Sequence, residues 1–133
     1  MAAIGAKVHI RQSVEVSEGI CRFRPTGECS LLEATELVSK ALAYCRDRSI
    51  PKLLVDGTGL VGLPIPSLVD RFLMVEDWAQ EAKGVVAMSL VVQPQYIHPD
   101  KFGVKVAAEL GFSAEVFPVE SDALAWLASV PAA

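Results

Sequence analysis

The chain has 133 residues, of which 52% are hydrophobic and 21% charged, and its formal net charge is −4. This composition excludes an intrinsically disordered chain, which needs low hydrophobicity and high charge, and the length is sufficient to bury a core without disulfides or metals. An acidic chain is also a poor nucleic-acid binder, because phosphate contacts need a basic surface. The sequence therefore predicts one folded domain over residues 1–133 that binds no nucleic acid.

The first residues and the cysteines indicate where such a protein works. Lys7, His9 and Arg11 interrupt the apolar core that an export signal needs. The longest mostly apolar stretch, residues 84–92, is far shorter than the roughly 20 residues of a membrane helix. We therefore expect a cytoplasmic protein without membrane insertion. Its three cysteines form no Cys-x-x-Cys pair, so we interpret them as buried thiols and expect no metal site.

The first third of the chain predicts a hairpin and a helix. Polar and apolar residues alternate over 7–16, which is the period of a strand with one exposed face, and 20–24 forms a second strand after a Ser-Glu-Gly turn. A Pro-Thr-Gly run is expected to end this second strand. Ser30 and Glu33 have the spacing of a capping box, and apolar residues recur every three to four positions after them. A helix is therefore predicted from Leu31 to Arg48.

The middle of the chain predicts two buried strands with a helix between them. Residues 53–55 form a short aliphatic run, which is typical of a parallel strand covered on both faces, and Asp56 stands at its end. A loop rich in glycine and proline leads to a helix that begins near Pro66 and stops at Gly84. The second buried strand spans 85–92. The buried stripe of the helix is expected to consist of Leu68, Phe72, Val75, Ala79 and Ala82.

The last third predicts a loop over 93–100, a short helix over 102–110 with Asp100 as its cap, a strand over 114–119 and a helix from Ser121 to Ser129. The order is strand, strand, helix, strand, helix, strand, helix, strand, helix. Right-handed crossovers make the later strands parallel, whereas the opening hairpin is antiparallel. We expect an α/β fold with a mixed, mostly parallel sheet of about five strands covered by about four helices.

A glycine motif follows the first buried strand. Gly57 to Gly62 matches G-x-G-x-x-G, the pattern of dinucleotide-binding loops, in which a helix opens within the glycines and its free N–H groups meet the pyrophosphate. Here Pro64 and Pro66 follow, so the helix must begin beyond the third glycine. We interpret the run as a strand-to-helix loop. No serine-hydrolase elbow, Walker loop or clustered metal ligands occur either, so we expect no enzyme activity, no cofactor and no metal.

The order of elements suggests a family. With Leu53-Leu54-Val55-Asp56 leading through a glycine loop into a helix, and an Ala-Leu-Ala-Trp-Leu run at 123–127, the chain resembles the STAS domain of sulphate transporters and anti-sigma-factor antagonists. The resemblance covers about residues 7–129. It implies a small sheet covered by helices, no catalytic centre and a regulatory protein partner. In the bacterial regulators it also implies a Ser or Thr at the start of the second helix that a kinase phosphorylates to switch partner binding.

The candidate phospho-acceptors are Ser67 and Thr58. Where the family carries an Asp-Ser-Ser/Thr-Gly element, this chain has Pro64-Ile65-Pro66-Ser67, so that only Ser67 keeps a hydroxyl, shifted in register. The two prolines are expected to withdraw two N–H donors that a phosphate would use at this helix start, which argues against the switch. Thr58 lies in the glycine loop. Helix capping and turn formation are the structural explanations of these two hydroxyls.

A ligand site is the alternative. We expect Asp56, Thr58, Tyr96 and His98 to share one edge of the sheet, because the carboxyl ends of parallel strands meet there. Together with Arg71, in the first turns of the helix that follows, we call them the rim residues. Arg71 could reach an anion at this edge. The structural explanations are that Asp56 accepts hydrogen bonds from the loop amides that follow it, and that the histidine only supports its loop.

We therefore expect a non-enzymatic regulatory domain that binds a protein partner, with a small-ligand (lipid or nucleotide) or catalytic domain as the alternative. A protein-binding domain should have a filled interior and an exposed apolar patch, whereas a ligand-binding domain should have a cavity that opens beside Asp56. A third alternative is a homodimer, because the first strand, within residues 8–16, offers an open sheet edge.

Overall fold

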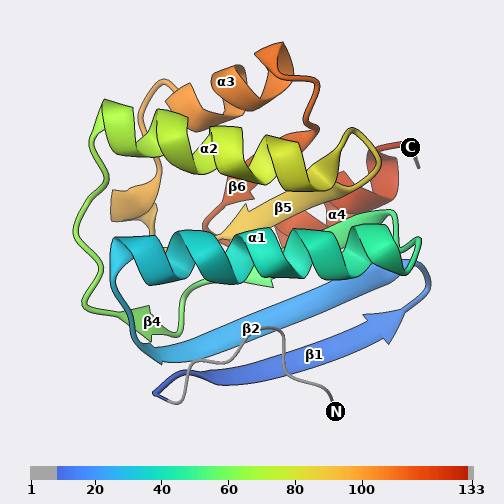
Figure 1. The fold of residues 1–133 in the computed structure, drawn as a ribbon, viewed down its shortest axis with the longest axis horizontal. Coiled ribbons are helices and arrows are strands. Elements are labelled where there is room, and N and C mark those ends of the chain that lie inside the picture. The colour runs from blue at the N-terminus through green and yellow to red at the C-terminus, as the bar shows by residue number, and fades with distance from the viewer. Residues whose placement is uncertain (1–8, 132–133) are drawn as a thin grey trace.

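The computed structural model describes residues 9–131 (Figure 1). Within them the sheet has six strands in the order β1-β2-β3-β5-β6, with β4 beside β2. The strands pair in parallel except for β1, which is antiparallel to β2, so the predicted mixed, mostly parallel sheet is confirmed. The elements are β1 Arg11–Ser17, β2 Ile20–Glu28, α1 Leu31–Asp47, β3 Lys52–Asp56, β4 Leu60–Val61, α2 Leu68–Ala82, β5 Ala87–Val91, the 3-10 turn η1 Pro94–Tyr96, α3 Phe102–Glu109, β6 Ala114–Phe117 and α4 Glu120–Ser129.

The helices form a layer on each face of the sheet. Figure 1 shows α1 and α2 side by side over one face, with α3 next to α2, and α4 on the opposite side. The larger part of the buried core lies between the sheet and α1, α2 and α3. On the other face, Leu54, Val91, Ala123 and Leu127 pack together under α4. None of the helices in residues 9–131 is long and apolar enough to cross a membrane.

Strand β2 is longer than predicted, because Pro25 does not end it. The first part of β2, Ile20–Phe23, pairs with β3, and its last part pairs with β4. The backbone N–H of Gly27 donates to the carbonyl of Gly59 at 3.1 Å. Because strand residues alternate in direction, the nitrogen of Pro25 faces the same side, in the gap between β3 and β4, where no ladder hydrogen bond is lost. The short strand β4 was not predicted, since it lies inside the glycine loop.

Several predicted boundaries need correction. β1 begins at Arg11, and residues 7 and 8 lie outside the described part of the chain. Asp100 does not cap α3: its own N–H donates to Nδ1 of His98 at 3.1 Å, and the chain enters α3 through Lys101, which has a φ of 51°. Ser121 does not cap α4 either, because that helix already begins at Glu120.

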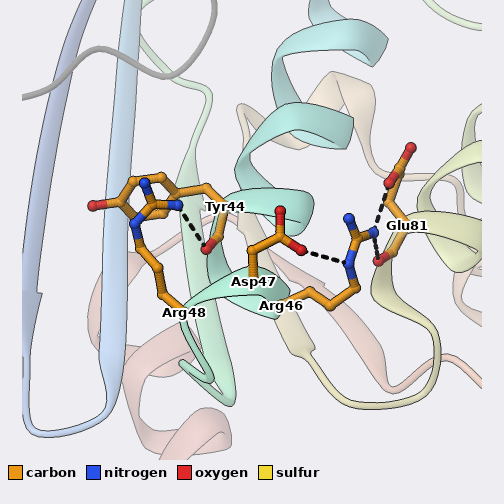
Figure 2. A network of polar contacts seen from close by, with 5 residues as sticks. All are labelled: Tyr44, Arg46, Asp47, Arg48 and Glu81. Atoms are coloured by element: carbon orange, nitrogen blue, oxygen red, sulfur yellow. Dashed lines mark hydrogen bonds and ion pairs between the residues drawn. The ribbon is translucent and has the colours of Figure 1, made fainter.

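The end of α2 is stabilised by a side chain from α1. Figure 2 shows Arg46, in the last turn of α1, reaching across to Glu81 near the end of α2. Its Nη1 donates to the Glu81 carbonyl and to the Glu81 carboxylate, each at 2.7 Å. The last turn of α2 holds no basic residue of its own, and a cation is favourable there because the carbonyl end of a helix carries partial negative charge. Arg46 also lies in the last turn of α1, so its charge is favourable at the carbonyl ends of both helices.

The buried stripe of α2 differs from the prediction. Val75, Trp78 and Ala82 are buried, whereas Leu68 and Phe72 are exposed by 51% and 41%. The first two turns of α2 are apolar on almost every side, so that periodicity could not identify the inner face. The inner face there begins with Arg71, which is half-buried and lies about two helical turns before Trp78.

Candidate functional site

Asp56, at the carboxyl end of β3, holds the loop that follows it. Its Oδ1 accepts the backbone N–H of Thr58 at 3.0 Å and the Thr58 hydroxyl at 2.6 Å. This is the geometry by which aspartate closes a turn on its own backbone. The interpretation that Asp56 accepts a hydrogen bond from the loop amides is therefore confirmed. Gln93 joins the loop from the other side, donating from Nε2 to the Thr58 carbonyl at 3.2 Å.

The glycine motif forms a turn and not a nucleotide cradle. The N–H of Gly57 donates to the carbonyl of Val91, and the N–H of Leu60 donates to the carbonyl of Gly57. The chain therefore turns directly into β4. A Cβ on Gly59 would lie 2.6 Å from Cγ2 of Thr26, which makes this a point of close approach to β2. The first N–H groups of α2 lie beyond the motif, since the helix begins at Leu68.

Ser67 is the N-cap of α2 and is exposed. Its Oγ accepts the N–H of Asp70 at 3.0 Å, while its own N–H donates to the Asp70 carboxylate at 3.0 Å. This capping box could have been found from the Ser-x-x-Asp spacing. Pro64 and Pro66 both precede the cap, so they remove no donor from the first turn of the helix. The expectation that the prolines weaken an anion site at the start of α2 is therefore wrong.

Arg71 and Tyr96 join three segments by hydrogen bonds. The guanidinium of Arg71 donates from Nη1 to the carbonyl of Tyr96 at 3.0 Å. The phenol of Tyr96 in turn donates to the carbonyl of Leu63 at 2.8 Å. These two bonds tie α2, the segment after β5 and the segment after β4 together. Nδ1 of His98 accepts the Asp100 N–H within the same loop, and the centroid of its ring lies 6.2 Å from that of Phe102 at the start of α3.

A cavity of about 160 Å³ lies between the sheet and the layer of α1, α2 and α3, and its lining is almost entirely apolar. Gly57, next to Asp56, is part of the wall, as are Arg71, Tyr96 and His98. Asp56 and Thr58 themselves do not line the cavity. The structure thus places three of the five rim residues at the cavity wall and pairs the other two with each other.

The sequence did not indicate three further polar residues of the wall, namely Gln93, Lys101 and Glu115. Nζ of Lys101 lies 3.0 Å from Oε1 of Glu115, which links the start of α3 to β6. Gln93 follows a parallel strand, and the same rule that selected Tyr96 could have selected it. Glu115 lies within a strand, and no local signal marks it.

The cysteines are buried and form no disulfide. Cys21 on β2 and Cys45 on α1 are hydrogen-bonded to each other, and this bond together with burial raises the pKa of the Cys45 thiol. That thiol therefore stays protonated and is a poor nucleophile. Among residues 9–131, no group of three or more His, Cys, Asp or Glu side chains could hold a metal ion.

An exposed apolar surface covers the start of α2. Five large hydrophobic side chains from the segment before the helix and from its first two turns are exposed, with Val69 the most exposed at 68%. They are Ile65, Leu68, Val69, Phe72 and Leu73, which we call the α2 patch. Contiguous exposed apolar residues on a small protein mark interaction surfaces more often than single ones do. The structure thus contains both an exposed apolar patch, which was expected of a protein-binding domain, and a cavity, which was expected of a ligand-binding domain.

Comparison with solved structures identifies the fold. An anti-sigma factor antagonist from Mycobacterium paratuberculosis is similar with a TM-score of 0.57 and 18% sequence identity, over 90% of this chain and 94% of that chain. An uncharacterised protein with a SpoIIAA-like fold from Shewanella loihica matches with a TM-score of 0.48 and 21% identity, over 94% of this chain and 99% of that one. No family model and no curated protein match the sequence. The chain has a STAS-like fold, as the resemblance in its sequence implied.

Proposed function

We propose that this chain is a regulatory domain that acts by binding and not by catalysis, and that it binds an anti-sigma factor through the α2 patch. The observation that carries the proposal is the run of exposed apolar side chains on the first two turns of α2. Two of them, Leu68 and Phe72, occupy positions that the sequence pattern assigns to a core. The similar Mycobacterium protein is an anti-sigma factor antagonist, which supports this choice of partner.

The form of the α2 patch suits a helix-centred interface. Leu68, Val69, Phe72 and Leu73 are spaced at one, three and four residues along α2, so they lie close together on its outer side. The inner side of the same turns is fixed by Arg71, whose hydrogen bond to the Tyr96 carbonyl holds the helix start in place. A rigid apolar surface loses little conformational entropy on binding.

The binding test uses a charge placed at the centre of the α2 patch. Val69→Asp is expected to weaken binding to the anti-sigma factors of the same cell by about 30-fold or more, because a carboxylate would be buried without a partner. A loss of this size is typical of substitution at the residues that dominate an interface. Binding is measured by isothermal titration with each purified anti-sigma factor. Val85→Asp is the matched control, since Val85 is also exposed, at 45%, but follows the other end of α2.

Two outcomes contradict this proposal. Equal weakening by Val69→Asp and Val85→Asp would show an effect of charge alone. Self-association of the wild-type chain in sedimentation, lost in Val69→Asp, would assign the α2 patch to a homodimer.

The other dimer alternative uses the open edge of β1, which within the described residues pairs with β2 alone. This dimer stays a prediction. Val69→Asp would leave such a dimer intact.

We also propose Ser67 as the phospho-acceptor in preference to Thr58. Ser67 is exposed and borders the α2 patch, whereas Thr58 is half-buried and its hydroxyl hydrogen is donated to Asp56 at 2.6 Å. Peptide mass spectrometry of the protein isolated from its own cells is expected to find phosphate on Ser67 and none after Ser67→Ala. Phosphate on Thr58 alone would contradict this assignment.

A further inference from the structure

We propose that the cavity between the sheet and helices α1, α2 and α3 is a binding site for a small carboxylic acid with one aromatic ring or a short aliphatic chain. The site is separate from the α2 patch, because the cavity lies on the inner side of α2 and the patch on its outer side. The proposal therefore does not depend on the partner proposed above.

The size of the cavity sets the size of the ligand. Its volume of about 160 Å³ is close to that of an engineered cavity of about 150 Å³, lined by aliphatic and aromatic side chains, that binds benzene. The wall includes Trp78, Met74 and Met88, which are large, polarisable side chains suited to an apolar ring. An acyl chain of membrane-lipid length would not fit into such a volume.

The polar groups of the wall set the chemistry of the other end of the ligand. Arg71 and Lys101 bring positive charge to the wall, and the carboxylate of Glu115 is paired with Lys101 at 3.0 Å. This pairing leaves Arg71 as the cation without a carboxylate partner among the described residues. Only its Nη1 is hydrogen-bonded there, to the Tyr96 carbonyl. A half-buried guanidinium with further N–H groups available is suited to a carboxylate.

The segments around Arg71 are joined by hydrogen bonds at the cavity wall. Tyr96 donates its phenol hydrogen to the Leu63 carbonyl, and Arg71 donates to the Tyr96 carbonyl. Leu63, Tyr96 and Arg71 all belong to the cavity wall. A carboxylate at the guanidinium of Arg71 would therefore lie beside the bonds that hold these segments together.

The test uses methionine methyl groups as reporters, because the chain has three methionines and two of them, Met74 and Met88, line the cavity. Protein labelled with [methyl-13C]methionine is titrated with benzoate, hexanoate and benzene. We expect saturable shifts of the Met74 and Met88 signals with all three probes, and at least tenfold tighter binding of benzoate than of benzene. The absence of saturable shifts for all three probes would overturn the proposal.

Two variants separate the apolar part of the site from the polar part. Ala107→Leu fills the cavity from α3 and is expected to weaken all three probes at least tenfold, while Ala108→Leu, on the exposed side of the same helix, should leave them unchanged. Arg71→Gln is expected to weaken benzoate and hexanoate at least tenfold more than it weakens benzene. This second variant keeps the test valid if Ala107→Leu fails to fold. Equal loss of benzene and benzoate in Arg71→Gln, or tight benzoate binding in a folded Ala107→Leu, would overturn the proposal.

Discussion

Trp78→Ala is expected to lower the free energy of unfolding by about 3–5 kcal/mol, the range measured for loss of a large buried aromatic side chain. Trp78 is 6% exposed and lies in α2, and its indole N–H donates to the carbonyl of Thr35 in α1 at 3.1 Å. The substitution removes both the apolar contacts and this bond between the two helices. It also enlarges the cavity that Trp78 lines, and the cost of such a substitution rises with the volume left empty.

The measurement is urea unfolding at equilibrium, with Trp126→Ala as the matched control. Trp126 is half-buried on α4, on the other face of the sheet, where it contacts Phe117. Its removal is expected to lower the free energy of unfolding by clearly less than the removal of Trp78. Equal losses of stability in the two variants would contradict the larger contribution expected of Trp78.

Ser89→Ala is expected to raise the free energy of unfolding by about 1–2 kcal/mol, because a buried hydroxyl without a hydrogen-bond partner costs about that much. Ser89 lies on β5, is fully buried, and its Oγ has no partner among the described residues. In the sheet it is paired with Leu54, which belongs to the apolar cluster under α4. Alanine has nearly the same shape, so the gain should come without overpacking.

Thermal and urea unfolding of Ser89→Ala against wild type measure this gain. Ser113→Ala, at an exposed position before β6, is the control and should change stability by no more than about 0.5 kcal/mol. A loss of stability in Ser89→Ala would mean that the hydroxyl is hydrogen-bonded to an ordered water molecule in solution.

The parts of the fold that depend on local signals could be predicted from the sequence. The capping box of Ser30 and Glu33 fixed the start of α1, and the aliphatic run before Asp56 identified β3 as a central strand. The last residues of β2 and the whole of β4 could not be predicted, because Pro25 is acceptable only where β2 changes its partner from β3 to β4. That change depends on neighbours more than twenty residues away.

The candidate site was predictable only in part, for the same reason. The rule that parallel strands end at one edge selected Tyr96 and His98, and Arg71 was selected by its place in the first turns of α2; all three line the cavity. The rule could not show that Tyr96 donates to a backbone carbonyl at Leu63, since any residue type can supply a carbonyl. The cavity itself arises from how three helices rest on the sheet, which no single segment of the chain encodes.

Helix α2 contributes to both proposed sites. Trp78 and Met74 belong to the cavity wall, while Val69 and Leu73 on the same helix are exposed in the α2 patch. A ligand that changes the position of α2 would thereby change the affinity for the partner by some factor. Thermodynamic linkage requires the partner to change the affinity for the ligand by that same factor. A helix placed in this way can report the concentration of a small metabolite to a protein that never contacts it.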